Sequence, residues 1–107
     1  MDPEELMEKA GQASRLLKSL ANERRLLIMY YLSEGEKSVG ELEPLVGLSQ
    51  SALSQHLARL RREHLVTTRR EAQTIFYSIS SEEARTVLGT LSELYCAEVQ
   101  DDSSRPG

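Results

Sequence analysis

The sequence predicts a mainly α-helical fold with one β-hairpin, in which four helices precede the hairpin and one follows it. Apolar residues recur at helical spacing through residues 1–62, interrupted at positions that suit helix caps. After His64 two short runs are rich in β-branched and aromatic residues, as strands are. Helical spacing returns after Ser80. A chain of 107 residues fits one small domain, which we expect over residues 1–100, with a polar, disordered tail over 101–107.

The first two helices have clear start signals. Asp2 caps the first helix, Pro3 suits its first turn, and Glu5 completes a capping box. An apolar stripe follows at three- or four-residue spacing: Leu6, Ala10, Ala13, Leu17 and Leu20. Asn22 caps the second helix, whose residues 26–32 are apolar on most sides. Such a helix belongs in the centre of the core.

Residues 34–36 (EGE) break the second helix, and two shorter helices follow. Ser38 and Glu41 form a capping box that opens a third helix, which we expect to end near Leu45. Residues 46–48 turn the chain. A fourth helix then begins after the capping residue Ser49 and runs to about residue 62.

The hairpin and the last helix complete the order. Strands are predicted over residues 65–68 and 74–79, joined by about three residues, 71–73. Ser80 and Glu83 then cap the last helix. One side of this helix is apolar: Ala84, Val87, Leu88, Leu91, Leu94 and Tyr95.

Two short helices joined by a tight turn, with a basic hairpin behind them, predict a winged helix-turn-helix of order α-α-α-α-β-β-α. In that motif the second helix enters the major groove of DNA, and the hairpin forms a wing over the adjacent backbone or minor groove. We therefore expect residues 1–100 to form a single domain for DNA binding and dimerisation.

The helical projection sorts the faces of the fourth helix, the predicted recognition helix. Leu53, Leu57 and Leu60 point to the core, while polar residue types occupy the opposite face. Gln can bond adenine, Ser can meet a base or a phosphate, and Arg can meet guanine or a phosphate. With the wing tip, the candidate DNA-binding residues are Ser49, Gln50, Ser51, Ser54, Gln55, His56, Arg59, Arg62, Arg69, Arg70 and Gln73.

The distribution of charge along the chain supports DNA binding better than the total charge does. The formal net charge is −4, from 13 Lys and Arg against 17 Asp and Glu, which by itself disfavours nucleic acid. Residues 1–10 sum to −3 and residues 81–107 to −4, but residues 48–80 sum to +3. A basic centre between acidic ends is an electrostatic footprint of DNA binding, although a solvated arginine-rich face has the same charge.

Residues 48–62 (LSQSALSQHLARLRR), with residues 20–26 (LANERRL) before them, resemble the ArsR/SmtB family of bacterial repressors. The resemblance covers roughly residues 12–97. It implies a homodimer built by the first and last helices that binds an inverted-repeat operator. Effector binding or thiol chemistry releases the operator in this family.

Residues 38–42 (SVGEL) and 94–96 (LYC) resemble the HlyU/BigR branch, which senses reactive sulfur or oxidants through two cysteines. In that branch the first cysteine follows Gly-Glu-Leu, where this chain has Glu43. Cys96 alone remains, so a dithiol switch within one chain is impossible. Two alternatives stay open: a single-thiol sensor at Cys96, or a regulator without a thiol response, metal-responsive or constitutive.

Other functions find less support in the residues. The third helix has no cysteine and the last has no histidine, so we expect neither a metal site nor a cofactor; Glu41, Glu43, Glu93 and Glu98 offer at most a weak carboxylate cluster. His56 is expected to pack or to contact phosphate, and His64 to end the fourth helix or meet solvent. The sequence has no Gly-rich phosphate loop and no G-x-S-x-G motif, so we expect no enzyme. A winged-helix adaptor that binds protein is the remaining alternative.

Three features of the sequence predict the cellular location and the oligomeric state. The longest apolar run, residues 26–32, is too short to span a membrane, and the acidic N-terminus is unlike a signal peptide. One cysteine cannot form an internal disulfide, so a reducing, cytoplasmic setting is expected. The apolar stripes on the first and last helices exceed what one small domain can cover, which also predicts a homodimer.

Overall fold

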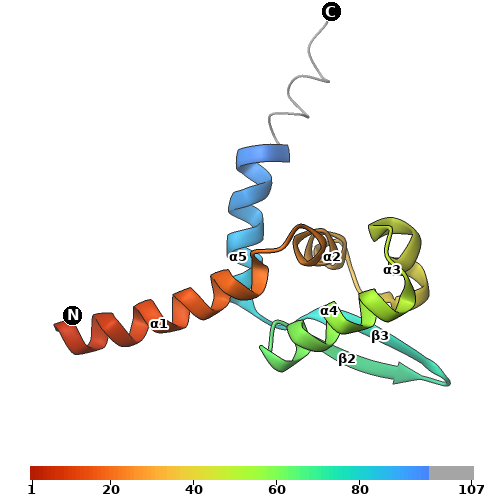
Figure 1. Cartoon of the computed structure of the whole chain (residues 1–107), viewed down its shortest axis with the longest axis horizontal. Helices are drawn as coiled ribbons and strands as arrows, with labels where there is room; N and C mark the ends of the chain where they lie inside the picture. The colour runs from red at the N-terminus through yellow and green to blue at the C-terminus, as the bar shows by residue number, and fades with distance from the viewer. Residues whose placement is uncertain (97–107) are drawn as a thin grey trace, which may run out of the picture.

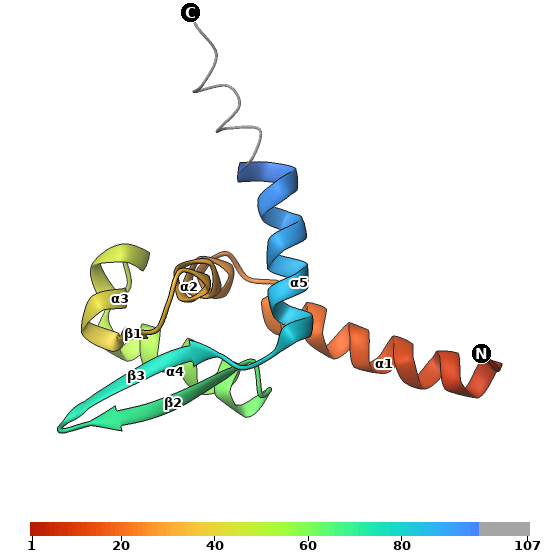
Figure 2. The same cartoon turned by 180° about the vertical axis from the view of Figure 1, so that it is seen from behind.

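The computed structural model describes residues 1–96 and confirms the predicted winged helix-turn-helix (Figure 1). The predicted tail lies outside the described residues. The elements are α1 (Pro3–Leu20), α2 (Glu23–Ser33), β1 (Lys37–Ser38), α3 (Val39–Val46), α4 (Gln50–Arg62), β2 (Val66–Glu71), β3 (Thr74–Ile79), α5 (Glu82–Leu91) and a π-helical turn η1 (Ser92–Cys96). Helix α1 projects from the body on one side, and the hairpin of β2 and β3 projects on the other (Figures 1 and 2).

The first two helices begin where the sequence predicts. The Asp2 carboxylate accepts a hydrogen bond from the Glu5 amide at 2.9 Å. No reciprocal bond from the Glu5 side chain occurs among the described residues, so Asp2 caps α1 without the predicted capping box. The Asn22 side chain accepts from the amides of Arg24 and Arg25, which satisfies two free donors of α2.

The two helices of the helix-turn-helix also have their predicted caps. Ser38 and Glu41 form the reciprocal capping box of α3, which ends at Val46, one residue beyond the expected end. Gly47 then adopts φ +67°, a left-handed conformation that glycine enters without steric cost. The Ser49 hydroxyl accepts from the Ala52 amide at 3.2 Å and starts α4.

The cap of the last helix was predicted one residue too early. Ser81, not Ser80, is the N-cap of α5, and its hydroxyl accepts from the Ala84 amide at 3.1 Å. The Ser80 amide instead donates to the Leu65 carbonyl at 2.9 Å, and the Ser80 hydroxyl donates to the His64 carbonyl at 3.3 Å. These bonds fix Ser80 at the end of the hairpin and leave the capping role to its neighbour.

The sheet is larger than the predicted hairpin. It has three antiparallel strands in the order β1-β3-β2, and the two-residue strand β1 was missed because so short a run carries no alternation. The sequence also predicted too short a first strand and too long a turn. Arg69, Arg70 and Glu71 pair with Phe76, Ile75 and Thr74, so only Ala72 and Gln73 join the strands. Ala72 has φ +55°, as tight hairpin turns require.

The core forms between α2, α4 and the hairpin. Its side chains, each at most 7% exposed, are Leu20, Ile28, Met29, Leu32, Leu42, Val46, Leu53, Leu57, Leu60, Leu65, Val66, Ile79, Ala84 and Leu88. Helix α2 is central, as predicted, but one side of it remains open: Leu26 and Leu27 are half-buried and Tyr30 is 39% exposed.

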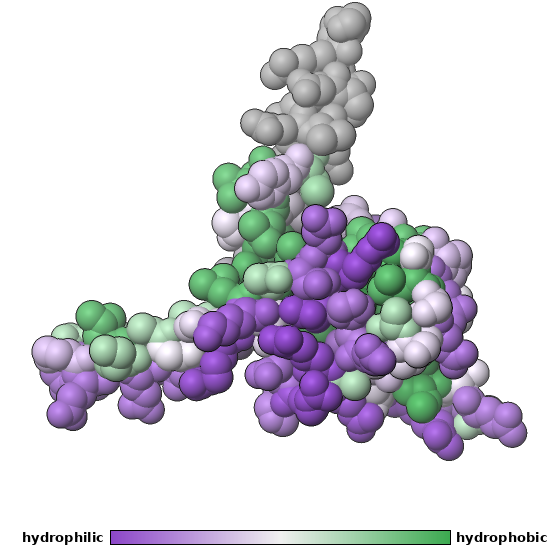
Figure 3. Space-filling view, in the orientation of Figure 1, coloured by the Kyte–Doolittle hydropathy of each residue, from purple (hydrophilic) through white to green (hydrophobic). Residues whose placement is uncertain are grey.

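Apolar side chains stay exposed on α1 and on η1, which continues α5. Figure 3 shows them along one side of α1 and over α5. They include Leu6, Met7, Leu17, Leu94 and Tyr95, each more than half exposed. Within residues 1–96, none of the helices combines the length and hydropathy needed to cross a bilayer.

Candidate nucleic-acid interface

The turn between α3 and α4 is held in place from α2. Arg24 Nη1 donates to the Val46 carbonyl at 2.5 Å, at the C-terminal end of α3 where backbone acceptors are free. Gly47 follows directly, and a Cβ there would lie 3.4 Å from the same Arg24 nitrogen. Arg24 and Gly47 therefore both contribute to holding the turn between α3 and α4.

Helix α4 presents the predicted two faces. Leu53, Leu57 and Leu60 have no exposed surface, so they anchor the helix rigidly in the core. The predicted contact residues on the other side are exposed: Ser49, Gln50, Ser51, Ser54, Gln55 and Arg62. Arg59 and His56 are half-buried at the edge of this face.

His56 lies closer to the protein interior than the other candidates. Its Nδ1 is 3.5 Å from Nη1 of Arg25, which is itself only 8% exposed. Arg25 Nε also donates to the Ser19 carbonyl at 2.6 Å, near the C-terminus of α1. Burial first, and then the positive charges of Arg25 and Arg24, lower the pKa of His56 below its ordinary value. His56 thus joins α4 to α2, and through Arg25 to α1.

Arg69 on the wing is bound within the protein. Its Nε lies 2.9 Å from each carboxylate oxygen of Glu36, and its Nη1 donates to Glu71 at 2.9 Å. Its Nη2 also donates to Glu36. The guanidinium lies over the Phe76 ring, 4.6 Å from the centroid. These bonds raise the pKa of Arg69 and lower that of the Glu36 carboxyl.

The other two wing candidates point to solvent. Arg70, near the end of β2, is exposed and has no ion pair among the described residues. Gln73 is exposed in the two-residue turn at the tip of the hairpin. Both positions suit contacts to a DNA backbone beside the recognition helix.

A groove between α4 and β3 adds residues that sequence reasoning did not select. Ala58, Arg61, Arg62 and Tyr77 line it. Only Arg62 was a candidate, although Ala58 and Arg61 continue the exposed stripe of Ser54 at helical spacing. Tyr77 had no local signal, because its place beside α4 depends on how the hairpin packs.

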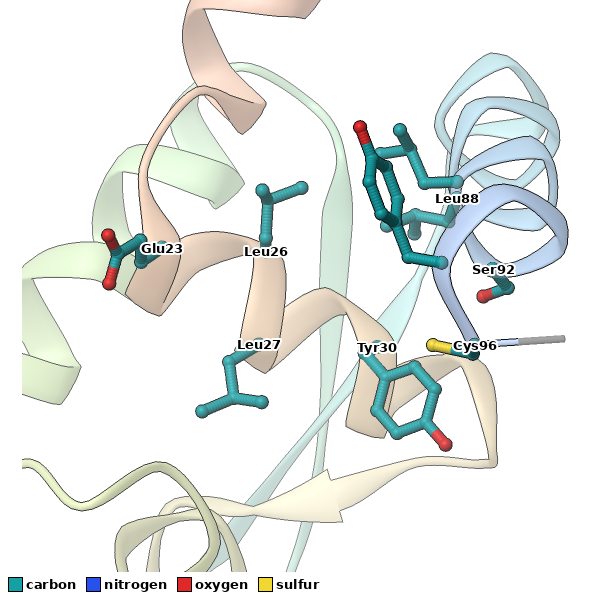
Figure 4. Close-up of a pocket in the computed structure, with 9 residues that line it drawn as sticks. Glu23, Leu26, Leu27, Tyr30, Leu88, Ser92 and Cys96 are labelled. Carbon is teal, nitrogen blue, oxygen red and sulfur yellow. The ribbon is translucent and has the colours of Figure 1, made fainter. Parts of the chain in front are cut away.

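Cys96 and Glu43, the two positions compared with the thiol-sensing branch, lie in different places. Cys96 is exposed in η1 and lines an apolar groove between α2 and α5 with Leu26, Tyr30 and Leu88 (Figure 4). Glu43 is half-buried on α3 and is not part of this groove. The described residues contain no group of three or more His, Cys, Asp or Glu placed to hold a metal ion. Glu98 lies outside the described residues.

Comparisons with known proteins point to one family. Residues 22–68, which span α2 to the start of β2, match the family described as bacterial regulatory protein, arsR family. The chain is 53% identical over 96 residues to the transcriptional activator HlyU of Vibrio cholerae, covering 90% of this chain and 89% of that protein. It is 39% identical over 98 residues to the biofilm growth-associated repressor of Xylella fastidiosa, covering 92% and 86%.

A solved structure shares the fold. Reduced HlyU from Vibrio cholerae superimposes with a TM-score of 0.83 at 54% sequence identity, covering 86% of this chain and 97% of that one. The likeness therefore extends beyond the helix-turn-helix to the flanking helices.

Proposed function

Since the chain belongs to the ArsR family of DNA-binding transcriptional regulators, we propose that it is a repressor that binds an inverted-repeat operator as a homodimer. In this proposal α4 enters the major groove and the wing lies over the neighbouring backbone. Gln55, Ser54 and Ser51 meet base edges, while Ser49, Gln50, His56, Arg59, Arg62, Arg70 and Gln73 meet phosphates or the rim of the groove. The proposed activity is binding, with no catalytic step, and the proposed setting is the cytoplasm.

The exposed polar face of α4 carries this proposal. Three fully buried leucines hold the helix backbone, so its outer side chains extend from fixed positions. That face carries Ser and Gln where a merely solvated helix more often carries Glu and Lys. A protein-binding adaptor would instead need apolar side chains on this surface, and they are exposed on α1 and η1.

A homodimer is supported by the location of those apolar side chains. Leu6 and Leu17 on α1 are 58% and 56% exposed, and Leu94 of η1 is 56% exposed. Burying such surfaces against a second copy favours association. A two-fold dimer also places two recognition helices about 34 Å apart, one turn of DNA.

Substitution of Gln55 tests the recognition face. Gln55→Ala should lower discrimination between the operator and single-base variants of it by about tenfold, since a bidentate base contact contributes ~1–3 kcal/mol. Mobility-shift titrations with the chain's own promoter region and its variants measure this. Gln12→Ala, on exposed α1, is the matched control. A Gln55→Ala protein with unchanged affinity and unchanged preference would refute the assignment of this face.

A thiol response through Cys96 is a second candidate function. The observation that favours it is an exposed thiol in an apolar groove between two helices, one of which belongs to the proposed dimer surface. Oxidation or persulfidation there changes a small apolar group into a polar one. The same titrations, run reduced and with polysulfide or peroxide, should show release of DNA by the wild type and not by Cys96→Ser. Equal release by both proteins would leave a regulator without a thiol response, and release by zinc would indicate a metal response.

A further inference from the structure

We propose that Arg69 positions the wing, by bracing it against the segment before β1, and that Arg70 makes the phosphate contact of the wing. This inference rests on the proposed function, DNA binding. It assigns different roles to two neighbouring arginines that the sequence grouped together as DNA-binding candidates.

The two side chains lie on opposite faces of the hairpin, because alternate residues of a strand point to opposite faces. Arg69 pairs with Phe76 on β3, and Arg70 pairs with Ile75. Thr68 and Tyr77 lie on the same face as Arg70, and they pair with each other two positions farther along the strands. Tyr77 lines the groove beside Arg61 and Arg62 of α4. Arg70 therefore shares its face with the groove next to the recognition helix, and Arg69 does not.

Each nitrogen of the Arg69 guanidinium already donates to a carboxylate. Nε and Nη2 bond the Glu36 carboxylate and Nη1 bonds Glu71, so two negative charges face one positive charge. The ring of Phe76 covers one side of the guanidinium. A phosphate at this guanidinium would meet two carboxylates beside it. Like charges at that distance oppose a phosphate contact.

The brace connects the wing to the helix-turn-helix. Glu36 is 33 residues from Arg69 and directly precedes β1. Ser38 of β1 pairs with Phe76 and is also the N-cap of α3. Arg69 therefore reaches across β3 to the segment that starts α3, and ties the outer strand of the wing to it. Exposed ion pairs are individually weak, but a bidentate arginine within a small network holds one geometry.

The salt dependence of DNA binding distinguishes a positioning residue from a phosphate contact. Each phosphate contact contributes about 0.9 to the slope of log K against log salt concentration. Arg70→Ala removes this contact from both protomers of the proposed homodimer and should reduce the slope by about 1.8. Arg69→Ala and Glu36→Gln should each weaken operator binding about threefold with the slope unchanged. The double variant should be no weaker than either single one, because both remove the same brace. A slope reduced by Arg69→Ala as much as by Arg70→Ala would overturn the inference.

Amide hydrogen exchange in the free protein tests the brace without DNA. Arg69→Ala and Glu36→Gln should each speed exchange at residues 37–38 and 75–78 several-fold, while Arg70→Ala should not. Unchanged exchange in both brace variants would overturn the inference. If the wild type bound no DNA at any salt concentration, the proposed function would fail, and the exchange rates would still decide whether the brace exists.

Discussion

His56 lies on the recognition helix and also contacts Arg25 of α2 at the edge of the core. It is half-buried, and the charges that shift its pKa are those of Arg25 and Arg24. Burial and positive charge both disfavour the imidazolium, so folding shifts His56 toward the neutral ring and lowers its pKa. A positively charged phosphate contact, the natural expectation for a histidine on this face, therefore has a folding cost.

This pKa shift makes stability depend on pH. The pKa of His56 is lower in the folded chain than in the unfolded chain, so its contribution to stability is complete above about pH 6.5 and is lost as the pH falls. His56→Gln should flatten the decline of the free energy of unfolding between about pH 7 and pH 5. Urea unfolding across this range measures it.

His64→Asn is the matched control, since His64 is exposed and Asn tolerates its left-handed φ of +61°. The control should keep the decline of the wild type. The carboxyl of Glu36 also has a lowered pKa, but its ion pair is lost only at more acidic pH, below about 4.5. If the His56→Gln protein kept the full decline of its free energy of unfolding, a group other than His56 would cause that decline.

At the scale of single elements, local signals placed each helix start within one residue. The one displaced start, that of α5, lies where two serines adjoin. Ser80 and Ser81 each carry a hydroxyl that could cap α5. The amide and hydroxyl of Ser80, however, donate to the carbonyls of Leu65 and His64. Competition from a distant segment decided which serine became the cap.

The two serines therefore make a matched pair of substitutions. Ser81→Ala should lower the free energy of unfolding by about 1 kcal/mol, because the Ala84 amide loses its acceptor. Ser80→Ala loses only an exposed bond of 3.3 Å and should change it by less than about 0.5 kcal/mol. Thermal or urea unfolding measures both values, and the reverse order would show that Ser80 is the cap in solution.

At the scale of the whole molecule, the protomer leaves its outer helices only partly covered. Helix α1 extends away from the core, and apolar side chains of α1 and η1 are exposed (Figure 3). The net charge of −4 does not indicate a DNA-binding surface, because the acidic residues concentrate in residues 1–10 and 81–107. The proposed dimer would bury the apolar sides and keep these acids away from the groove.

Leu17→Glu tests this arrangement. Leu17 is 56% exposed on α1, and a carboxylate there would be desolvated twice in a symmetric dimer. We expect the dimer dissociation constant to rise at least about 100-fold, corresponding to roughly 1.5 kcal/mol lost per protomer. Sedimentation at micromolar concentration measures it, and operator affinity should fall with it.

Gln12→Glu is the control, because it adds the same charge on the other side of α1 and should leave the oligomeric state unchanged. A Leu17→Glu protein that sediments like the wild type would place the interface elsewhere. A wild type that sediments as a monomer would count against the proposed homodimer itself.

The sequence by itself determined the order of the helices and the hairpin, most helix ends and the two faces of α4. Caps such as Asn22 and Ser49, and the spacing of Leu53, Leu57 and Leu60, act between residues at most a few positions apart. Such signals can be followed along the chain without knowing the fold. The recognition face was predictable for the same reason.

Only the tertiary structure decided which of these residues are bound to one another. It paired Arg69 with Glu36, placed His56 against Arg25, added β1 beside β3 and engaged Ser80 at the end of the hairpin. Each of these contacts joins segments whose approach depends on packing of the whole core. Neighbouring and chemically identical residues, Arg69 and Arg70 or Ser80 and Ser81, thereby acquire different surroundings that no local pattern distinguishes.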